Sequence, residues 1–212
     1  MKRIQHFIWD FDGTLFDTYP AIIQDLRLAL QEYGQDCDPL EALRFMLETT
    51  IPETRNHYAD VYGIGREALA DAYSRHRAKT MALLQAEPFT GVKEVLERIQ
   101  STGRYNYIFT NRKGAETELY LKKHGLDGYF REIIGSESPY FAKKPAPDAV
   151  LHILEKFHIA PNEAVMVGDR DCDLESGRNA GIRAAHLVCP SVPQNLNCDW
   201  RLEDFSQMLT LL

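Results

Sequence analysis

The sequence predicts an α/β protein in which a doubly wound parallel sheet carries an inserted helical domain. Two observations lead to this prediction. Short apolar runs alternate with helical patterns along most of the chain, and one long segment contains helical patterns alone. The apolar runs that we expect to be strands are Phe7–Trp9, Tyr107–Phe109, Ile133–Ile134, Ala164–Val167 and Ala184–Val188.

Amphipathic helices are expected between these strands. Apolar residues recur at helical spacing in two stripes, Val92, Val95, Leu96 and Ile99, then Ala149, Val150, Ile153, Leu154 and Phe157. A third helix, near Ala115–His124, is expected to end at Gly125, because glycine suits the position after a helix. Strands that alternate with helices form βαβ units, so the sheet should be parallel and Rossmann-like. Such sheets bind ligands outside the carboxyl ends of their strands.

The alternation is interrupted between about Tyr19 and Leu84, where we find helical patterns and no convincing strand. Pro39, Pro52 and the turn Gly63-Ile64-Gly65 divide this segment into shorter helices. We expect a helical bundle inserted after the first strand. Residues 1–16 and 88–212 are therefore assigned to the Rossmann-like core, and residues 17–87 to the helical insertion.

The composition is that of an ordinary globular chain of 212 residues, with 44% hydrophobic and 26% charged residues. No segment approaches the roughly 20 apolar residues of a membrane helix, and the apolar run after Met1-Lys2-Arg3 is too short for a secretion signal. A cytoplasmic location without a membrane partner is expected. The net charge of −7 argues against a nucleic-acid partner, which needs a basic face. The four cysteines show no CxxC spacing and are expected to be free thiols.

Polar residues occur where strands end or helices begin in four segments. They are Asp10 to Asp12, Thr110-Asn111, Lys143 to Asp148, and Asp169 to Asp173. Each segment alone is more often a turn, a helix cap or a solvated loop. A parallel sheet, however, brings all four segments to one edge, where carboxylates, a hydroxyl and a lysine share a pocket.

The first segment is the most informative one. If the strand continued, its alternation would point Asp10 and Asp12 to the same side. Two like charges so close together cost free energy, unless a bound cation offsets their repulsion or they are needed for proton transfer. Such a pair suits one nucleophile and one acid/base group, with a hard divalent cation between the nucleophile and a phosphate.

Taken in order, the four segments resemble the motifs of the haloacid dehalogenase superfamily, specifically its phosphatases with a helical cap inserted after the first strand. The matching stretches are DFDGTLFDT (Asp10–Thr18), IFTN (Ile108–Asn111), KKP (Lys143–Pro145) and GDRDCD (Gly168–Asp173). The resemblance covers about residues 3–188. It implies that residues 17–87 are the cap and that Gly177 and Gly181 allow close packing.

The resemblance implies a role for each polar residue. Asp10 would attack phosphorus and form an aspartyl-phosphate, while Asp12 would protonate the leaving oxygen and later activate water. Thr110 would donate a hydrogen bond to the phosphoryl group, and Lys144 would neutralise its charge. Backbone N–H groups would be further donors, those of Phe11, Asp12 and Asn111.

The resemblance also implies that Mg²⁺ is the cofactor. Its ligands would be the carboxylate of Asp10, the backbone carbonyl of Asp12 and the carboxylate of Asp169. Asp173 would lie close by or act through a water molecule.

The implied activity is the hydrolysis of small phosphate monoesters. The core is similar to phosphoglycolate phosphatases and to beta-phosphoglucomutases. Lys144–Asp148 is closer to the mutases, and Thr110-Asn111 is closer to the phosphatases. A phosphomutase with the same intermediate is therefore the alternative, and a non-catalytic binding module is a third possibility.

The expected partner is a small phosphorylated metabolite, and the expected assembly is a monomer or a weak homodimer. The cap should close over the pocket and read the leaving group. Its candidate contact residues are Arg44, Arg55, His57, Tyr58, Arg75, His76, Arg77 and Lys79.

Overall fold

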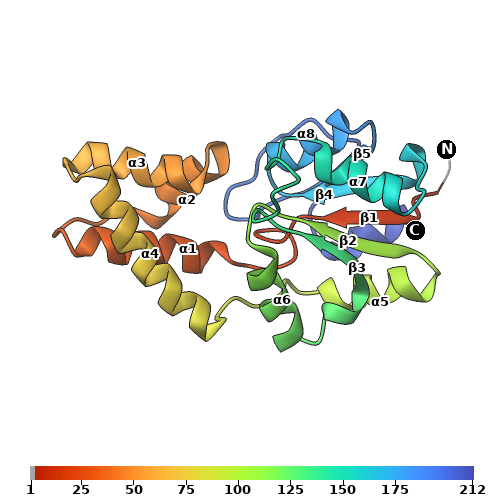
Figure 1. Cartoon of the computed structure of the whole chain (residues 1–212), viewed down its shortest axis with the longest axis horizontal. Helices are drawn as coiled ribbons and strands as arrows, with labels where there is room; N and C mark the ends of the chain where they lie inside the picture. Colours follow the sequence, from red (N-terminus) through yellow and green to blue (C-terminus); the bar gives the residue numbers. More distant parts are fainter. Residues whose placement is uncertain (1–2) are drawn as a thin grey trace. The chain divides into compact units, whose positions relative to one another are not determined.

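The computed structural model of the chain describes residues 3–212. Within these residues, a six-stranded parallel sheet has the strand order β3-β2-β1-β4-β5-β6 (Figure 1). The strands are β1 (His6–Trp9), β2 (Tyr105–Phe109), β3 (Phe130–Ile134), β4 (Ala164–Gly168), β5 (Arg183–Leu187) and β6 (Trp200–Leu202). The predicted fold class and the five expected strands are thus confirmed. The sixth strand, β6, was not expected.

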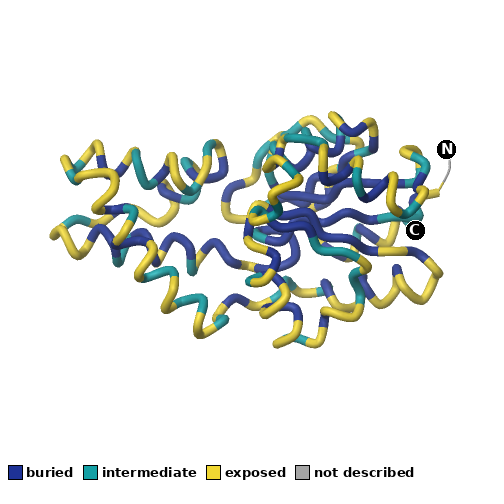
Figure 2. The backbone as a smooth tube through the Cα atoms, in the orientation of Figure 1, coloured by how far each residue is buried: buried dark blue, intermediate teal, exposed yellow. Residues whose placement is uncertain are grey.

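Helices cover both faces of this sheet. They are α5 (Val92–Ser101), α6 (Gly114–Lys123), α7 (Asp148–Lys156) and α8 (Asp171–Asn179), with short 3₁₀ helices η1 (Asp127–Tyr129), η2 (Pro161–Glu163) and η3 (Phe205–Leu211). Figure 1 shows α7 and α8 on one face of the sheet and α5 and α6 on the other. The central strands between them are buried along almost their whole length (Figure 2).

Side chains that alternate along the strands fill the two sides of the sheet. On one side, Ile8, Tyr107 and Met166 belong to one buried cluster with Val150 and Ile153 of α7. On the other side, the Trp9 ring stacks on Phe205 of η3 with 6.0 Å between the ring centroids. The central strands are therefore largely apolar on both faces, and the polar residues singled out in the sequence follow where the strands end.

Residues Thr18–Ala86 form a separate compact unit of four helices. They are α1 (Tyr19–Gln31), α2 (Pro39–Glu48), α3 (Ile51–Tyr62) and α4 (Arg66–Leu83). The carboxylate of Asp38 caps α2 by accepting hydrogen bonds from the N–H groups of Leu40 and Glu41, at 2.9 Å each. Gly63 ends α3 in the left-handed conformation, with φ of 66°.

The helical unit is joined to the rest of the chain by a short two-stranded stem. The Asp17 N–H donates to the Glu87 carbonyl at 3.0 Å, and the Phe89 N–H donates to the Leu15 carbonyl at 3.0 Å. The second compact unit comprises the described residues up to Asp17 together with Glu87–Leu212. These limits differ by one residue from the expected boundaries.

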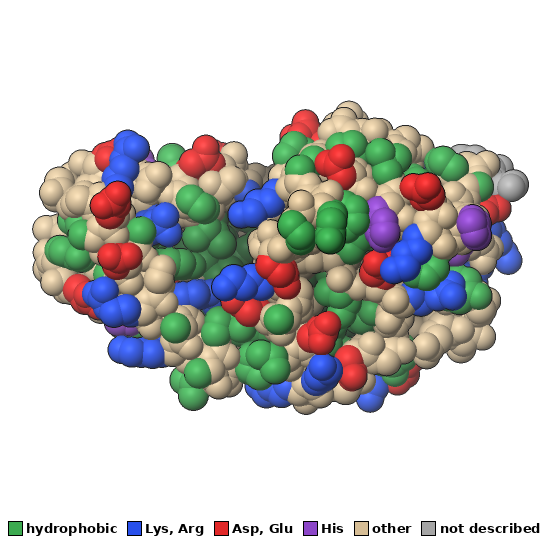
Figure 3. Space-filling model, viewed as in Figure 1, with side chains coloured by type: hydrophobic (Ala, Val, Ile, Leu, Met, Phe, Trp, Pro, Cys, Tyr) green, Lys and Arg blue, Asp and Glu red, His purple; other side chains and the backbone are tan. Residues whose placement is uncertain are grey.

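None of the helices in residues 3–212 combines the length and the apolar character needed to cross a membrane. All four cysteines are free thiols. On the face that Figure 3 shows, acidic and basic side chains are interspersed.

Gly177 allows α8 to lie against β4. A Cβ atom on Gly177 would come within 2.6 Å of the Cβ atom of Met166, which lies in β4. Gly181 has a different function, contrary to the expectation of close packing. A Cβ atom there would meet nothing within 4 Å, but its φ of 76° places it in the left-handed region that favours glycine.

Gly177→Ala is expected to lower the free energy of unfolding by about 1–3 kcal/mol, because the new methyl group overpacks the contact between α8 and β4. Urea denaturation of both proteins measures this difference. Gly128→Ala is the matched control, because a Cβ atom at Gly128 meets nothing within 4 Å. An equal effect of both substitutions would mean that the close approach at Gly177 is not the cause.

Candidate active site

The strand order changes direction at β1, and this switch point lies at the carboxyl end of that strand. The chain runs from β1 through β2 to β3 on one side, then returns to β4 on the other side of β1. Neighbouring connections therefore diverge at this point, which leaves room for a ligand. Asp10 directly follows β1, and its N–H donates to the Val167 carbonyl of β4 at 2.9 Å. The nucleophile expected from the sequence thus lies at the switch point of the sheet.

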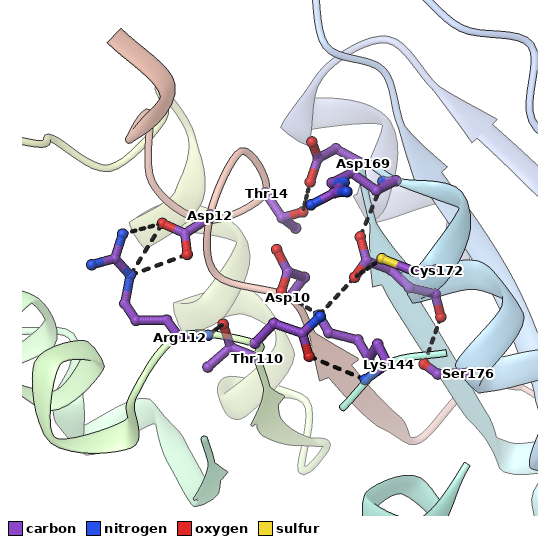
Figure 4. A network of polar contacts seen from close by, with 12 residues as sticks. Asp10, Asp12, Thr14, Thr110, Arg112, Lys144, Asp169, Cys172 and Ser176 are labelled. Atoms are coloured by element: carbon purple, nitrogen blue, oxygen red, sulfur yellow. Dashed lines mark hydrogen bonds and ion pairs between the residues drawn. The ribbon is translucent and has the colours of Figure 1, made fainter. Parts of the chain in front are cut away.

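Lys144 lies between two of the expected acidic residues. Its ammonium group forms ion pairs with Oδ1 of Asp10 and, at 2.6 Å, with Oδ1 of Asp173. All three side chains are almost completely buried. The loop that carries Lys144 is held by the segment that follows β2, because the Lys144 N–H donates to Oδ1 of Asn111 at 3.1 Å (Figure 4).

Asp169 completes an acidic cluster with Asp10 and Asp173. One carboxylate oxygen of each residue lies within 4.8 Å of the others. The Thr14 hydroxyl donates to Oδ1 of Asp169 at 2.9 Å and orients that carboxylate. The four segments that the sequence singled out therefore meet in one buried site.

Gly168 makes room for this cluster. A Cβ atom on Gly168 would lie 2.2 Å from the Cβ atom of Asp173, a distance that no folded protein tolerates. The N-terminus of α8 also holds the Asp173 side chain, because its Oδ2 accepts a hydrogen bond from the Arg170 N–H at 3.0 Å. The last residue of β4 must therefore lack a side chain for Asp173 to reach Lys144.

The charges in the cluster do not balance. Three carboxylates and one ammonium group give a formal charge of −3 + 1 = −2. Burial raises the pKa of Asp10 well above its usual range; Lys144 opposes this rise, and the nearby carboxylates of Asp173 and Asp169 add to it. Burial alone would lower the pKa of Lys144, but Asp10 and Asp173 raise it above its usual value.

This donor set fits a hard divalent cation. Mg²⁺ prefers carboxylate and carbonyl oxygens, and the cluster offers three carboxylates from three different segments. A charge of +2 would cancel the formal charge of the cluster and oppose the rise in the pKa of Asp10. The residues present thus match Mg²⁺ both in ligand type and in charge.

The two residues after β2 lie next to this cluster and hold neighbouring loops. Thr110 is buried, and its N–H donates to the Ile134 carbonyl at 3.0 Å. Its hydroxyl oxygen accepts a hydrogen bond from the Arg112 N–H at 3.1 Å, so the hydroxyl proton can point in another direction. The Asn111 side chain holds the Lys144 loop, in addition to the backbone role expected for it.

Asp12 lies apart from the acidic cluster. The strand ends at Trp9, and a tight turn follows in which the N–H groups of Leu15 and Phe16 both donate to the Phe11 carbonyl at 3.0 Å. Alternation along the strand therefore does not extend to position 12. Figure 4 shows the Asp12 carboxylate turned toward Arg112. The Phe11 side chain is fully buried, which leaves only its backbone for the expected contact with phosphate.

Arg112 is the residue of this site that sequence reasoning missed. Its guanidinium donates to both carboxylate oxygens of Asp12, at 3.1 Å from Nε to each oxygen. It also donates from Nη1 to Glu116 of α6 at 3.2 Å. An arginine three residues after a strand end is usually a solvated loop residue, and only its position two residues after Thr110 could have drawn attention to it.

Several cap residues that were expected to contact substrate form ion pairs within the helical unit. Arg75 and His76 both pair with Glu32, at 2.5 Å and 2.8 Å. Arg77 lies 3.6 Å from the buried carboxylate of Asp25. These ion pairs give the three side chains partners within the helical unit. Contact of any of the eight candidates with substrate stays a prediction.

Comparison with known proteins identifies the family. Residues 7–187 match the family described as haloacid dehalogenase-like hydrolase. A phosphoglycolate phosphatase of Nitrosospira multiformis is 31% identical over 195 residues, which cover 89% of this chain and 82% of that protein. A protein of Caldanaerobacter subterraneus subsp. tengcongensis named "Putative pyrophosphatase PpaX" is 28% identical over 216 residues, which cover 99% of this chain and 95% of that protein.

Solved structures show the same fold. The crystal structure of a haloacid dehalogenase superfamily hydrolase from Geobacter sulfurreducens aligns with a TM-score of 0.74 and 24% identity, covering 99% of this chain and 96% of that one. The motifs resembled this superfamily, and both the family match and the sheet with its buried acidic cluster agree with that resemblance. The chain therefore belongs to the haloacid dehalogenase-like hydrolases.

Proposed function

We propose that this chain is a Mg²⁺-dependent phosphatase that hydrolyses small phosphate monoesters through an aspartyl-phosphate on Asp10. The observation that carries the proposal is the buried cluster at the end of β1, in which three carboxylates lie close together and two of them pair with one ammonium group. The names of the relatives, a phosphoglycolate phosphatase and a pyrophosphatase, support phosphate chemistry of the same class.

In the first step, a carboxylate oxygen of Asp10 attacks phosphorus, and the bond between phosphorus and the ester oxygen breaks. Asp12 gives its proton to the leaving oxygen. Lys144, which lies against Asp10, offsets the negative charge of the phosphoryl group. Thr110 and the backbone N–H groups of residues 11, 12 and 111 donate to the phosphoryl oxygens.

In the second step, water attacks the phosphorus of the aspartyl-phosphate while Asp12 takes a proton from that water. The bond between phosphorus and the Asp10 oxygen breaks, and inorganic phosphate leaves. Asp10 is again a carboxylate, and Asp12 again carries the proton that it needs for the next ester.

Mg²⁺ would be held by Asp10, Asp169 and Asp173, with the backbone carbonyl of Asp12 as a further oxygen ligand. When bound, it reduces the repulsion between the anionic nucleophile and the anionic phosphate.

The substrate class that we propose is a small phosphorylated metabolite, such as a sugar phosphate, phosphoglycolate or a nucleoside monophosphate. The alternative, a phosphomutase, would keep the aspartyl-phosphate from water while the substrate turns round. Which cap residues read the leaving group stays a prediction. The monomer or weak homodimer, the cytoplasmic location and the lack of nucleic-acid or membrane partners also stay predictions.

Asp10→Asn is expected to lower phosphate release by at least about a thousandfold, because an amide oxygen is too weak a nucleophile for phosphorus. The measurement is the inorganic phosphate released from a panel of small phosphate esters, with Mg²⁺ and with EDTA. EDTA is expected to stop release by the unaltered chain. The amide keeps the shape of the side chain, so the urea midpoint should change little.

Asp171→Asn is the matched control for this experiment, because Asp171 is exposed and pairs with Arg178 outside the cluster. Full phosphate release by Asp10→Asn would remove Asp10 from the mechanism. An isomerised sugar phosphate without released phosphate would favour the phosphomutase. No reaction with any ester would favour the binding module.

Mg²⁺ is expected to stabilise the folded chain by about 2.7 kcal/mol when its concentration is one hundred times its dissociation constant, because it binds the folded cluster and not the unfolded chain. Thermal unfolding at increasing Mg²⁺ concentration measures this effect without any substrate. Asp169→Asn should lose most of the stabilisation, and Asp171→Asn should keep it. An equal response of both variants would place the Mg²⁺ site elsewhere.

A further inference from the structure

His186 is a buried histidine that none of the proposed steps uses. It lies in β5 and is only 1% exposed. Burying a histidine costs free energy unless its ring nitrogens have hydrogen-bond partners. Within the described residues, Nδ1 of His186 is buried and has no such partner. The other ring nitrogen, Nε2, donates a hydrogen bond to the backbone carbonyl of Asp169. This contact is therefore what a histidine adds at position 186.

Asp169 lies just beyond the end of the sheet. The last register pair between β4 and β5 joins Gly168 to His186. Asp169 directly follows Gly168, and α8 begins only at Asp171. Asp169 is thus part of neither the strand nor the helix. The hydrogen bond from the His186 ring ties this connecting residue to β5, at the point where the pairing of the two strands ends.

Asp169 is held at its side chain and at its backbone by two different residues. The Thr14 hydroxyl donates to Oδ1 (Figure 4), and the His186 ring donates to the carbonyl oxygen. Asp169 is buried, and one of its carboxylate oxygens lies within 4.8 Å of a carboxylate oxygen of Asp10 and of Asp173. Mg²⁺ demands near-ideal ligand geometry, so the position of each of these oxygens affects its affinity.

We propose that His186 is a positioning residue that holds Asp169 in place for Mg²⁺. The inference rests on the proposed Mg²⁺-dependent function, in which Asp169 is a ligand. Replacing a residue that holds a metal ligand typically weakens metal binding by about 10- to 100-fold. His186 is therefore expected to determine how tightly the cation binds, and to have little effect on the rate once the cation is bound.

The experiment measures Mg²⁺ binding without substrate in two variants of the same chemistry. In His186→Gln, the amide N–H lies at about the position of Nε2 and can still reach the Asp169 carbonyl, whereas the side chain of His186→Asn is one carbon shorter and cannot. The dissociation constant of Mg²⁺ follows from the rise of the melting temperature with Mg²⁺ concentration. It is expected to increase about tenfold or more in His186→Asn and less than about threefold in His186→Gln.

Phosphate release tests the same inference in the complete reaction. In His186→Asn, the Mg²⁺ concentration for half-maximal release should rise by the same factor as the dissociation constant. The value of kcat at saturating Mg²⁺ should stay within about threefold of that of the unaltered chain. His6→Asn is the matched control, because His6 pairs with the Tyr107 hydroxyl at 3.2 Å, at the opposite end of β1 from Asp10. This variant should bind Mg²⁺ as the unaltered chain does.

An unchanged dissociation constant in His186→Asn, or an equal increase in His186→Gln or in His6→Asn, would overturn the inference. The proposed function would survive these outcomes, provided that Mg²⁺ stabilises the unaltered chain and not Asp169→Asn. No response of the unaltered chain to Mg²⁺ would refute the proposed cofactor and this inference together. Urea midpoints without Mg²⁺ separate weaker binding from loss of fold. If His186→Asn does not fold, His186→Leu tests the same loss without burying a polar group.

Discussion

The ion pairs of Lys144 with Asp10 and Asp173 are the interaction on which the rest of the site depends. Buried carboxylates repel one another strongly, because the protein interior screens charge poorly. The ammonium group makes their approach tolerable but leaves a formal charge of −2 with Asp169 included. The divalent cation that we propose for this site would cancel that charge.

Several contacts around the cluster hold its residues in place. The strand order places Asp10 beside the ends of β2 and β4, and Gly168 lets Asp173 approach the end of β4 closely. Asn111 holds the Lys144 loop, and Thr14 orients Asp169. Each of these contacts joins segments far apart in the sequence. The chemistry thus resides in side chains, while the sheet provides the common edge at which they meet.

Much of this could be predicted from the sequence, because the strongest signals are local. Five apolar runs indicated strands, and polar residues directly after them indicated the edge where the site lies. The strand β6 gave no such signal, because it has only three residues and Arg201 at its centre is exposed. Gly181 was assigned to close packing because the sequence does not distinguish a tight contact from a left-handed backbone.

The pairing of Asp12 with Arg112 could not be predicted for a different reason. It depends on where the chain turns after Trp9, and that turn sends Asp12 away from the side that strand alternation would give it. Whether an arginine is buried depends on the partners that the fold brings to it, here Asp12, Glu116 and two aromatic rings. Such information is absent from the spacing of residues and appears only in three dimensions.

The stem below the helical unit has a consequence for how such proteins diversify. Its two strands are fastened to each other by hydrogen bonds at Leu15, Asp17, Glu87 and Phe89, so the chain leaves the sheet and returns to it at nearly the same point. The hydrogen bonds of the stem offset the entropic cost of closing the loop that contains the inserted helices, and this cost rises only slowly with the length of the loop. A larger or smaller set of helices can therefore replace this one while the sheet and its functional residues keep their positions.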